Sequence, residues 1–322
     1  MSISNKTTIT LSSGYEIPVI GLGTWQSKPN EVAQAVEVAL KYGYRHIDGA
    51  AIYRNEEEVG RGWQASGVSR GQIFLTSKLW NSRHAPQEVL KAIDQTLSEL
   101  GTDYLDLFLI HWPLAFRPGS DYFPRDEEGL IVLDRETKIE DTWRAMEKLV
   151  EQGKVRSIGV SNFDIPKLEK LLSFANIKPS VNQIEGHAYL LQPELHEFHK
   201  KHGIVPIAYS PLGNNIYGKA RVIDDPEVKE IAESLQKNPA NVLVSYLIQK
   251  GFVVIPKSVT PSRIKSNFDV FSLPTEVVAR LEKLDRGIRY NDPVAWGFDM
   301  FGEQGGDAAA LEKAKQIVAQ NK

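Results

Sequence analysis

The sequence predicts an α/β fold, a (β/α)8 TIM barrel with an N-terminal β-hairpin and a C-terminal loop or tail. Three observations favour it: short apolar segments alternate with segments of helical periodicity, eight such units fit the chain, and two long segments follow the fourth and seventh strands. The 322 residues allow about 40 residues for each unit. A barrel of this type typically needs about 250 residues, so the excess is available for loops and a tail.

The predicted strands are short runs rich in apolar and β-branched residues. They cover residues 21–25, 44–48, 73–78, 105–110, 157–160, 181–185, 204–209 and 251–256. Helices are predicted over residues 31–42, 86–99, 139–151, 166–174, 193–202 and 226–235. In the first helix, apolar residues recur at the i, i+3, i+4 and i+7 positions that form one face. Prolines near the starts of later helices favour a first helical turn.

A doubly wound open sheet is the main alternative fold, and it carries a G-x-G-x-x-G turn between its first strand and helix. Gly21 and Gly23 supply only two of the three glycines, so the barrel is favoured. Residues 112–135 and 213–225 are then expected to be loops on the C-terminal face, where barrels bind ligands. Residues 8–18 are expected to form a hairpin at the opposite end.

The composition is that of a globular protein, with 42% hydrophobic and 25% charged residues. A net charge of −3 gives no support to binding of nucleic acid or of an anionic membrane, and no apolar run approaches the roughly 18 residues of a membrane span.

The chain has no cysteine, which excludes disulfides and thiolate metal sites and fits a cytoplasmic protein. No metal site is predicted. No linker precedes about residue 303, so one domain is expected over residues 1–322.

Four polar residues stand at or just after the C-terminal ends of the second, third and fourth predicted strands. They are Asp48, Tyr53, Lys78 and His111. Each alone has an ordinary structural explanation, but together they suit proton donation to a carbonyl. A phenol with a pKa of about 10 becomes a better donor beside an ammonium, which lowers that pKa. A carboxylate holds the ammonium, and an imidazole binds the carbonyl oxygen. None of these groups transfers hydride, so a redox reaction requires a cofactor.

Eight motifs of this chain resemble those of the aldo-keto reductases, in the same order, over about residues 8–302. They are Gly21-Leu22-Gly23-Thr24-Trp25, His46-Ile47-Asp48, Tyr53-Arg54-Asn55-Glu56, Lys78-Leu79-Trp80-Asn81, His111-Trp112-Pro113, Gly159-Val160-Ser161-Asn162-Phe163, Asn182-Gln183 and Ile255-Pro256-Lys257-Ser258. Residues 143–146, 209–215 and 290–293 are similar to fungal-type members, which include glyceraldehyde reductases, NADP-linked glycerol dehydrogenases and xylose reductases. The resemblance implies reversible NADPH-dependent reduction of aldehydes or short aldoses, without a Rossmann domain.

The resemblance also implies residue roles. Tyr53 would be the general acid, Lys78 and Asp48 would tune it, and His111 would orient the carbonyl. The implied cofactor residues are Thr24, Trp25, Asp48, Ser161, Asn162, Gln183, Tyr209, Ser210, Leu212, Asn214, Asn215, Lys257, Ser258, Arg263 and Asn267. Independently of the resemblance, Lys257 and Arg263 flank the turn after the last strand, where barrels commonly bind phosphate. The guanidinium of Arg263 and the ammonium of Lys257 together suit a 2′-phosphate, which favours NADPH over NADH.

The expected substrate pocket is aromatic, and its substrate is a small aldehyde or aldose. The residues predicted to bind it are Trp25, Tyr53, Trp80, His111 and Trp112, with Phe116, Tyr122, Phe123 and Trp296 as further candidate walls. Glyceraldehyde, glycerol in the reverse direction, xylose, galacturonate and aromatic aldehydes all stay open. Arg117 and Arg125 on the first long loop are expected to be exposed rather than to bind a carboxylate.

Two other functions are alternatives: a non-catalytic cofactor-binding barrel, and a Schiff-base aldolase with Lys78 or Lys257 as nucleophile. A monomer is expected, with a dimer as the alternative. The resemblance leaves residues 303–322 unassigned. Residues 308–319 have helical composition, which predicts either a docked helix or a frayed tail.

Overall fold

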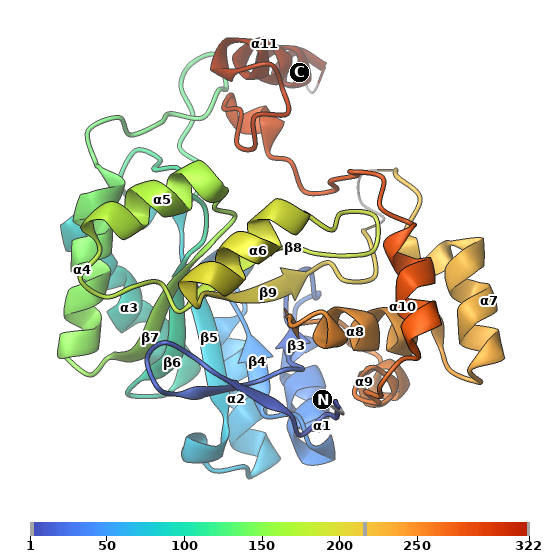
Figure 1. Cartoon of the computed structure of the whole chain (residues 1–322). Helices are drawn as coiled ribbons and strands as arrows, with labels where there is room; N and C mark the ends of the chain where they lie inside the picture. Colours follow the sequence, from blue (N-terminus) through green and yellow to red (C-terminus); the bar gives the residue numbers. More distant parts are fainter. Residues whose placement is uncertain (1–2, 215–217, 321–322) are drawn as a thin grey trace.

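The computed structural model describes residues 3–214 and 218–320, and eight parallel strands form its centre (Figure 1). In chain order they are β3 (Leu22–Gly23), β4 (His46–Asp48), β5 (Phe74–Leu79), β6 (Leu105–Ile110), β7 (Val155–Ser161), β8 (Val181–Glu185), β9 (Val205–Tyr209) and β10 (Val253–Val254). Each strand pairs with the next one along the chain, so the sheet order follows the sequence.

The two ends of this sheet, β3 and β10, meet and close it. The backbone N–H of Gly21 donates to the Val254 carbonyl at 2.9 Å, and the N–H of Val254 donates to the Val19 carbonyl at 2.8 Å. A further parallel bridge joins Gly23 to Lys257. Closure rules out the open doubly wound sheet and confirms the predicted (β/α)8 barrel, because an open sheet would leave both edge strands unpaired.

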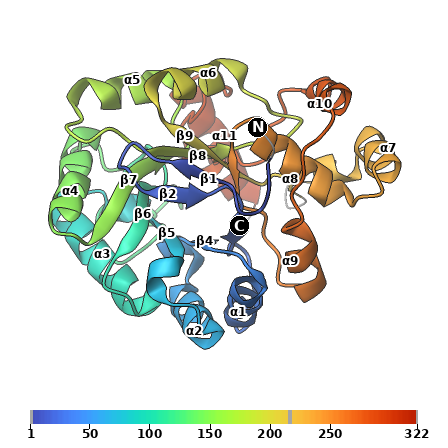
Figure 2. The ribbon, with the colours of Figure 1, turned by 60° about the horizontal axis from the view of Figure 1, so that its bottom comes forward.

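Helices surround the barrel, as the view in Figure 2 shows. Those predicted from the sequence are α1 (Val32–Tyr42), α3 (Pro86–Leu100), α4 (Ile139–Glu151), α5 (Ile165–Phe174), α6 (Pro193–His202) and α7 (Pro226–Ser234). The described residues also form α2 (Glu56–Ser66), α8 (Pro239–Gln249), α9 (Pro261–Asn267), α10 (Thr275–Glu282) and α11 (Asp307–Gln320). Within residues 3–214 and 218–320, we find no helix with the length and apolarity that crossing a membrane requires.

A hairpin covers the end of the barrel where the strands begin (Figure 2), as predicted. Its strands β1 (Thr8–Thr10) and β2 (Glu16–Pro18) pair antiparallel, with Ile9 opposite Ile17. Ile17 and Leu11 are buried in the apolar cluster that fills the barrel. The hairpin therefore closes this end, and the opposite end is the one that is free to bind ligands.

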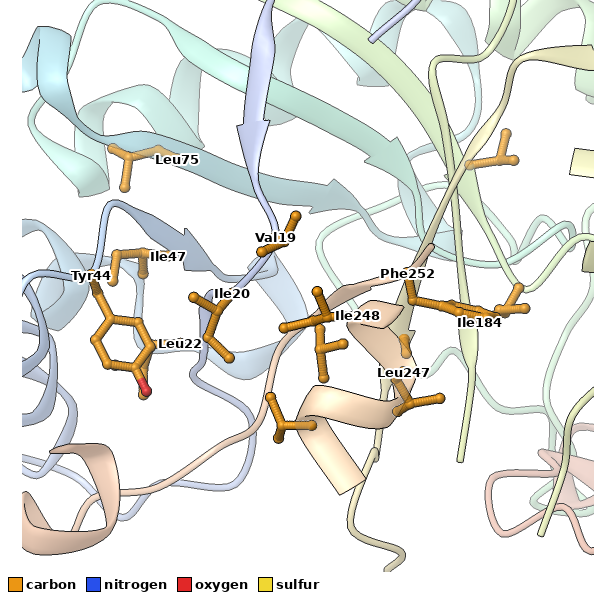
Figure 3. Packing of buried hydrophobic residues seen from close by; sticks show 14 of the residues in the cluster. Val19, Ile20, Leu22, Tyr44, Ile47, Leu75, Ile184, Leu247, Ile248 and Phe252 are labelled. Atoms are coloured by element: carbon orange, nitrogen blue, oxygen red, sulfur yellow. The ribbon is translucent and has the colours of Figure 1, made fainter. Parts of the chain in front are cut away.

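Strand residues alternate between the inside of the barrel and the layer beneath the helices. On β6, Leu107 and Leu109 belong to the inner cluster, whereas Phe108 and Ile110 belong to the outer one. Both faces of β6 are covered, which accounts for its continuous apolar run over residues 107–110. Figure 3 shows part of the outer layer, where Ile47, Leu75 and Tyr44 from β4, β5 and the segment before β4 lie in one group with Ile20 and Leu22.

Helices α1 and α2 approach closely at Gly62. A Cβ atom built there would lie 2.5 Å from the Ala33 carbonyl oxygen and 2.8 Å from Val36 Cβ. We expect Gly62→Ala to lower the free energy of unfolding by about 1–3 kcal/mol, since the helices must move apart. Urea denaturation measures this. The control is Gly71→Ala, where a Cβ meets no atom within 4 Å; an equal loss in both variants would contradict the close-contact explanation.

Candidate active site

Consecutive parallel strands bring the predicted catalytic residues together at the open end of the barrel. Asp48 is the last residue of β4, Lys78 is next to last on β5, and His111 directly follows β6. In the sheet register Asp48 pairs with Thr76, and Lys78 pairs with Leu109. Because the side chains of β5 alternate, Lys78 faces the barrel interior while Ser77 faces the helices.

Lys78 is fully buried and is the centre of a polar cluster. Its Nζ lies 2.5 Å from Asp48 Oδ1, donates to the Gly49 carbonyl at 2.8 Å and lies 3.4 Å from Tyr53 Oη. The other carboxylate oxygen, Asp48 Oδ2, accepts from Gln183 Nε2 at 2.7 Å. Burial by itself lowers the pKa of Lys78, but the Asp48 carboxylate and Tyr53 raise it above its ordinary value. Lys78 is therefore an ammonium at neutral pH.

Tyr53 is held by a short turn between β4 and α2. It ends the 3-10 helix η1 (Ala51–Tyr53), and the next residue, Arg54, adopts a left-handed backbone conformation with φ of 55°. Asn55 Nδ2 then donates to the Thr24 carbonyl at 3.0 Å. These contacts place the phenol above the Lys78 ammonium, with the ring centroids of Tyr53 and His111 5.9 Å apart.

Burial sets the protonation state of the phenol and the imidazole. It raises the pKa of Tyr53 above its ordinary value, and the opposing effect of Lys78 does not offset it. The expectation of a lowered phenol pKa is therefore wrong here, because desolvation of the phenolate outweighs its attraction to the ammonium. Burial also holds the pKa of His111 well below its ordinary value, with Lys78 and His84 acting in the same direction. At neutral pH the phenol keeps its proton and the imidazole is uncharged.

The residues implied to bind the nicotinamide amide form a connected network. Asn162, with φ of 64°, donates from Nδ2 to the His111 carbonyl at 3.0 Å and to Ser161 Oγ at 3.1 Å. Its Oδ1 accepts from the Tyr209 hydroxyl at 2.7 Å. Ser161 Oγ donates to the Gln183 carbonyl at 2.8 Å. The structure thus brings four sequence-predicted residues, on or just after β7, β8 and β9, into direct contact.

A cavity of about 1090 Å³ connects these groups with the turn after β10. Its lining includes nearly all the predicted site residues: Thr24, Trp25, Asp48, Tyr53, Trp80, His111, Trp112, Ser161, Asn162, Gln183, Tyr209, Ser210, Leu212, Asn214, Lys257, Ser258, Arg263 and Asn267. Lys78 lies beneath this surface, against Asp48. Asn215 lies outside the described residues.

The two cations predicted to bind a 2′-phosphate lie on the turn after β10 and on α9. Lys257 Nζ donates to the Gln26 carbonyl at 3.0 Å, and burial lowers the pKa of this lysine. Arg263 is exposed and lines the cavity. Beside them, Ser258 Oγ accepts from the Thr260 N–H at 3.1 Å, which holds the turn. Both cations are therefore available to an anion in the cavity.

An aromatic wall, defined here as Trp25, Trp80, Trp112, Phe123 and Trp296, lines the cavity beside Tyr53 and His111. Trp296 meets Trp80 and Trp112 edge to face, with ring centroids 5.8 and 5.2 Å apart. Of the other candidates, Phe116 packs behind Trp296, and the Tyr122 carbonyl accepts from Trp80 Nε1 at 2.6 Å. Arg117 and Arg125 are exposed and are not among the lining residues, as expected.

The C-terminal tail is a docked helix. Residues Ala310 and Ala314 of α11 are buried, and a Cβ at Gly297, next to Trp296, would lie 3.2 Å from Leu311. In Figure 1, α11 lies beyond the open end of the barrel, near the long loop that follows β6. A Cβ at Gly129 of that loop would lie 3.1 Å from Val318. The tail thus supports the aromatic wall from outside.

Sequence reasoning missed Asn291 as a site residue. It lines the cavity, and its Nδ2 donates to Glu185 Oε2 at 2.8 Å. Its Oδ1 accepts from Asn214 Nδ2 at 3.3 Å. The buried carboxylate of Glu185 also accepts the backbone N–H of Tyr290. The only sequence signal was the Tyr290-Asn291-Asp292-Pro293 motif, which by itself does not show that this segment reaches the barrel.

Comparison with known proteins agrees with this geometry. The model of the aldo/keto reductase family matches residues 19–286. The chain belongs to the aldo/keto reductase family. Members of this family are NAD(P)H-dependent oxidoreductases, and this reductase acts on a small-molecule substrate. Relatives named as reductases give no support to the non-catalytic alternative, and the ion pair of Lys78 with Asp48 disfavours a Schiff-base nucleophile.

Individual relatives of this reductase cover most of its length. It is 45% identical to the D/L-glyceraldehyde reductase of Hypocrea jecorina, over 96% of this chain and 98% of the relative. It is 49% identical to an uncharacterized oxidoreductase of Schizosaccharomyces pombe, over 88% and 89%. The solved structure of the aldose reductase of Schistosoma japonicum superposes with a TM-score of 0.85 at 43% identity, covering 89% of this chain and 95% of that one.

Proposed function

We propose that this reductase uses NADPH to convert aldehydes or short aldoses, such as glyceraldehyde or xylose, to alcohols, reversibly. The observation that carries the proposal is the cluster of Tyr53, Lys78, Asp48 and His111 at the floor of a cavity that extends to Lys257 and Arg263. The glyceraldehyde reductase and aldose reductase among its relatives support this substrate class.

The donor set suits the cofactor. Ser161, Asn162 and Gln183 would hold the nicotinamide amide, and Tyr209 would stack on its ring. The segment 210–214 would follow the pyrophosphate, Asn267 would contact the adenine, and Lys257, Ser258 and Arg263 would bind the 2′-phosphate. A cavity of about 1090 Å³ is of the size that a dinucleotide and a small substrate require. Bound there, NADPH supplies the hydride for the carbonyl carbon.

The protein supplies the proton. Tyr53 Oη donates it to the carbonyl oxygen, and the raised pKa of this phenol ensures that the proton is present at neutral pH. Lys78 Nζ, 3.4 Å from Oη, stabilises the phenolate that forms, and Asp48 holds the ammonium in place. The uncharged His111 hydrogen-bonds to the same carbonyl oxygen and orients it.

The function is tested by following NADPH absorbance with glyceraldehyde and with xylose. We expect aldehyde-dependent oxidation of NADPH, with a higher kcat/KM than for NADH. Absence of turnover with NADPH bound would instead support a non-catalytic cofactor-binding barrel.

The role of the two cations is tested by the double variant Lys257→Met, Arg263→Met. Because it removes two charge-assisted hydrogen bonds to the 2′-phosphate, we expect the Kd for NADPH to rise about 100-fold. The Kd for NADH, which lacks this phosphate, should change by less than about threefold. Fluorescence titration measures both. Lys265→Met, on α9 but not lining the cavity, is the control; equal weakening of NADPH and NADH would contradict the assignment.

A further inference from the structure

Cationic side chains that line the cavity lie on the loop after β9, on the turn after β10 and on α9. Among the described lining residues they are Lys257, Arg263 and Arg221. The first two would be engaged by the 2′-phosphate. Arg221, on the loop after β9, is paired with Asp224 at 2.7 Å. The aromatic wall contributes no lysine or arginine to the described lining of the cavity.

Arginines near the aromatic wall are directed elsewhere. Arg54 lies over the ring of Tyr122, 4.9 Å from its centroid, and Arg125 donates to the Gly129 carbonyl at 2.6 Å. Arg289 is paired with Glu303 at 2.9 Å and lies over the Phe301 ring. None of the three is among the described residues that line the cavity. Lys78, the nearest ammonium to the carbonyl, is already neutralised by Asp48.

The acidic side chains among the described lining residues are Asp48, Asp224 and Asp292. Asp48 is paired with Lys78 and Asp224 with Arg221, which leaves Asp292 as the one that has no ion pair among the described residues. Asp292 lies four residues before Trp296 of the aromatic wall, and its Oδ2 accepts from Gln304 Nε2. Its Oδ1 is buried without a hydrogen-bond partner among the described residues. Burial raises the pKa of Asp292, and Glu303 acts in the same direction, although Arg289 opposes it. The carboxylate is therefore only partly compensated.

These charges act differently on neutral and acidic substrates. A carboxylate entering beside the indoles would lose hydration without gaining a cationic partner, and it would also be repelled by Asp292. An uncharged aldehyde loses less hydration and gains contact with the aromatic rings. We propose that this reductase selects uncharged aldehydes and rejects those that carry a carboxylate, and that Asp292 is a specificity-determining residue. The proposal rests on the proposed function and narrows its substrate class.

The experiment compares uncharged and acidic aldehydes that have the same carbon skeleton. With saturating NADPH, kcat/KM is measured for 4-carbamoylbenzaldehyde against 4-carboxybenzaldehyde, and for butanal against succinic semialdehyde. We expect the uncharged member of each pair to be favoured by about tenfold or more. Equal values, or a preference for the acids, would overturn the proposal. This arm needs only the unaltered protein.

Asp292→Asn tests the residue itself. We expect it to raise kcat/KM for the acidic aldehydes by about fivefold, and to change the uncharged ones by less than about twofold. The control is Asp103→Asn, an exposed aspartate just before β6, at the far end of that strand from the site. If the ratio of kcat/KM between acidic and uncharged aldehydes is unchanged in Asp292→Asn, or changes equally in the control, Asp292 does not determine the specificity.

The same assays separate this inference from the proposed function. If none of the four aldehydes nor glyceraldehyde is reduced with NADPH, the proposed function fails and the inference fails with it. If aldehydes are reduced but the acids are preferred, the proposed function stands and only the inference is overturned.

Discussion

Tyr53→Phe is expected to lower kcat for aldehyde reduction by about 100-fold to 10,000-fold, because it removes the positioned proton donor. The phenol is the acidic group that lies above the Lys78 ammonium at 3.4 Å, and the half-buried ring is retained in the variant. Tyr53 is not among the residues proposed to hold the cofactor. The Kd for NADPH should therefore change by less than about twofold. Steady-state kinetics and fluorescence titration of NADPH measure the two quantities.

The matched control is Tyr104→Phe, which removes a hydroxyl just before β6, outside the lining of the cavity. It should leave kcat unchanged. Retention of activity in Tyr53→Phe would show that another group donates the proton. Loss of NADPH binding together with turnover would show that Tyr53 acts through the cofactor site instead.

The unaltered protein is expected to lose about 3 kcal/mol of its free energy of unfolding through Glu56 as the pH rises, and Glu56→Gln is expected to abolish this loss. Glu56 is buried, and it accepts from the hydroxyls of Ser77 and of Thr96, the latter at 3.0 Å. Burial raises the pKa of this carboxyl from 4.5 to about 7, although the two hydroxyls oppose the shift. Between these values the folded protein binds more protons than the unfolded chain. The free energy of unfolding therefore falls as pH rises from about 4.5 to about 7.

The variant lacks this ionisation. Its free energy of unfolding, compared with that of the unaltered protein at the same pH, should therefore be more favourable at pH 8 than at pH 5. Urea denaturation at both pH values measures the difference. Glu57→Gln, an exposed neighbour in the same helical turn, is the control and should show a change of less than about 0.5 kcal/mol. If Glu56→Gln has the same effect at both pH values, Glu56 does not titrate between them in the folded protein.

Most of the barrel was predictable because its signals are local. The strands that end at Asp48, Lys78 and Ile110 are short apolar runs, and the helices between them have one apolar face. The sequence did not predict α8, because residues 240–248 are all buried. Its polar residues Asn241 and Ser245 form hydrogen bonds with residues 269 and 271 instead of facing solvent, so the helix lacks the exposed polar face on which such predictions depend.

The candidate site was predictable in its residues but not in its contacts. The order of Asp48, Tyr53, Lys78 and His111 along neighbouring strands was enough to place them at one end of the barrel. The contact of Asn291 with the site was not predictable, since its partner Glu185 is 106 residues away in the sequence. The net direction of the Tyr53 pKa also depended on burial, which residue identity alone does not give.

The sequence by itself determined the fold class, the family and the set of chemical groups, because each depends on short motifs and on their order along the chain. Only the tertiary structure decided which loops form the walls of the cavity, that the C-terminal tail is a docked helix, and that the lysines and arginines among the described lining residues lie on the segments after β9 and β10 and not in the aromatic wall. Charge and burial at a point in space depend on every segment that packs around it. Those segments meet only when the barrel closes.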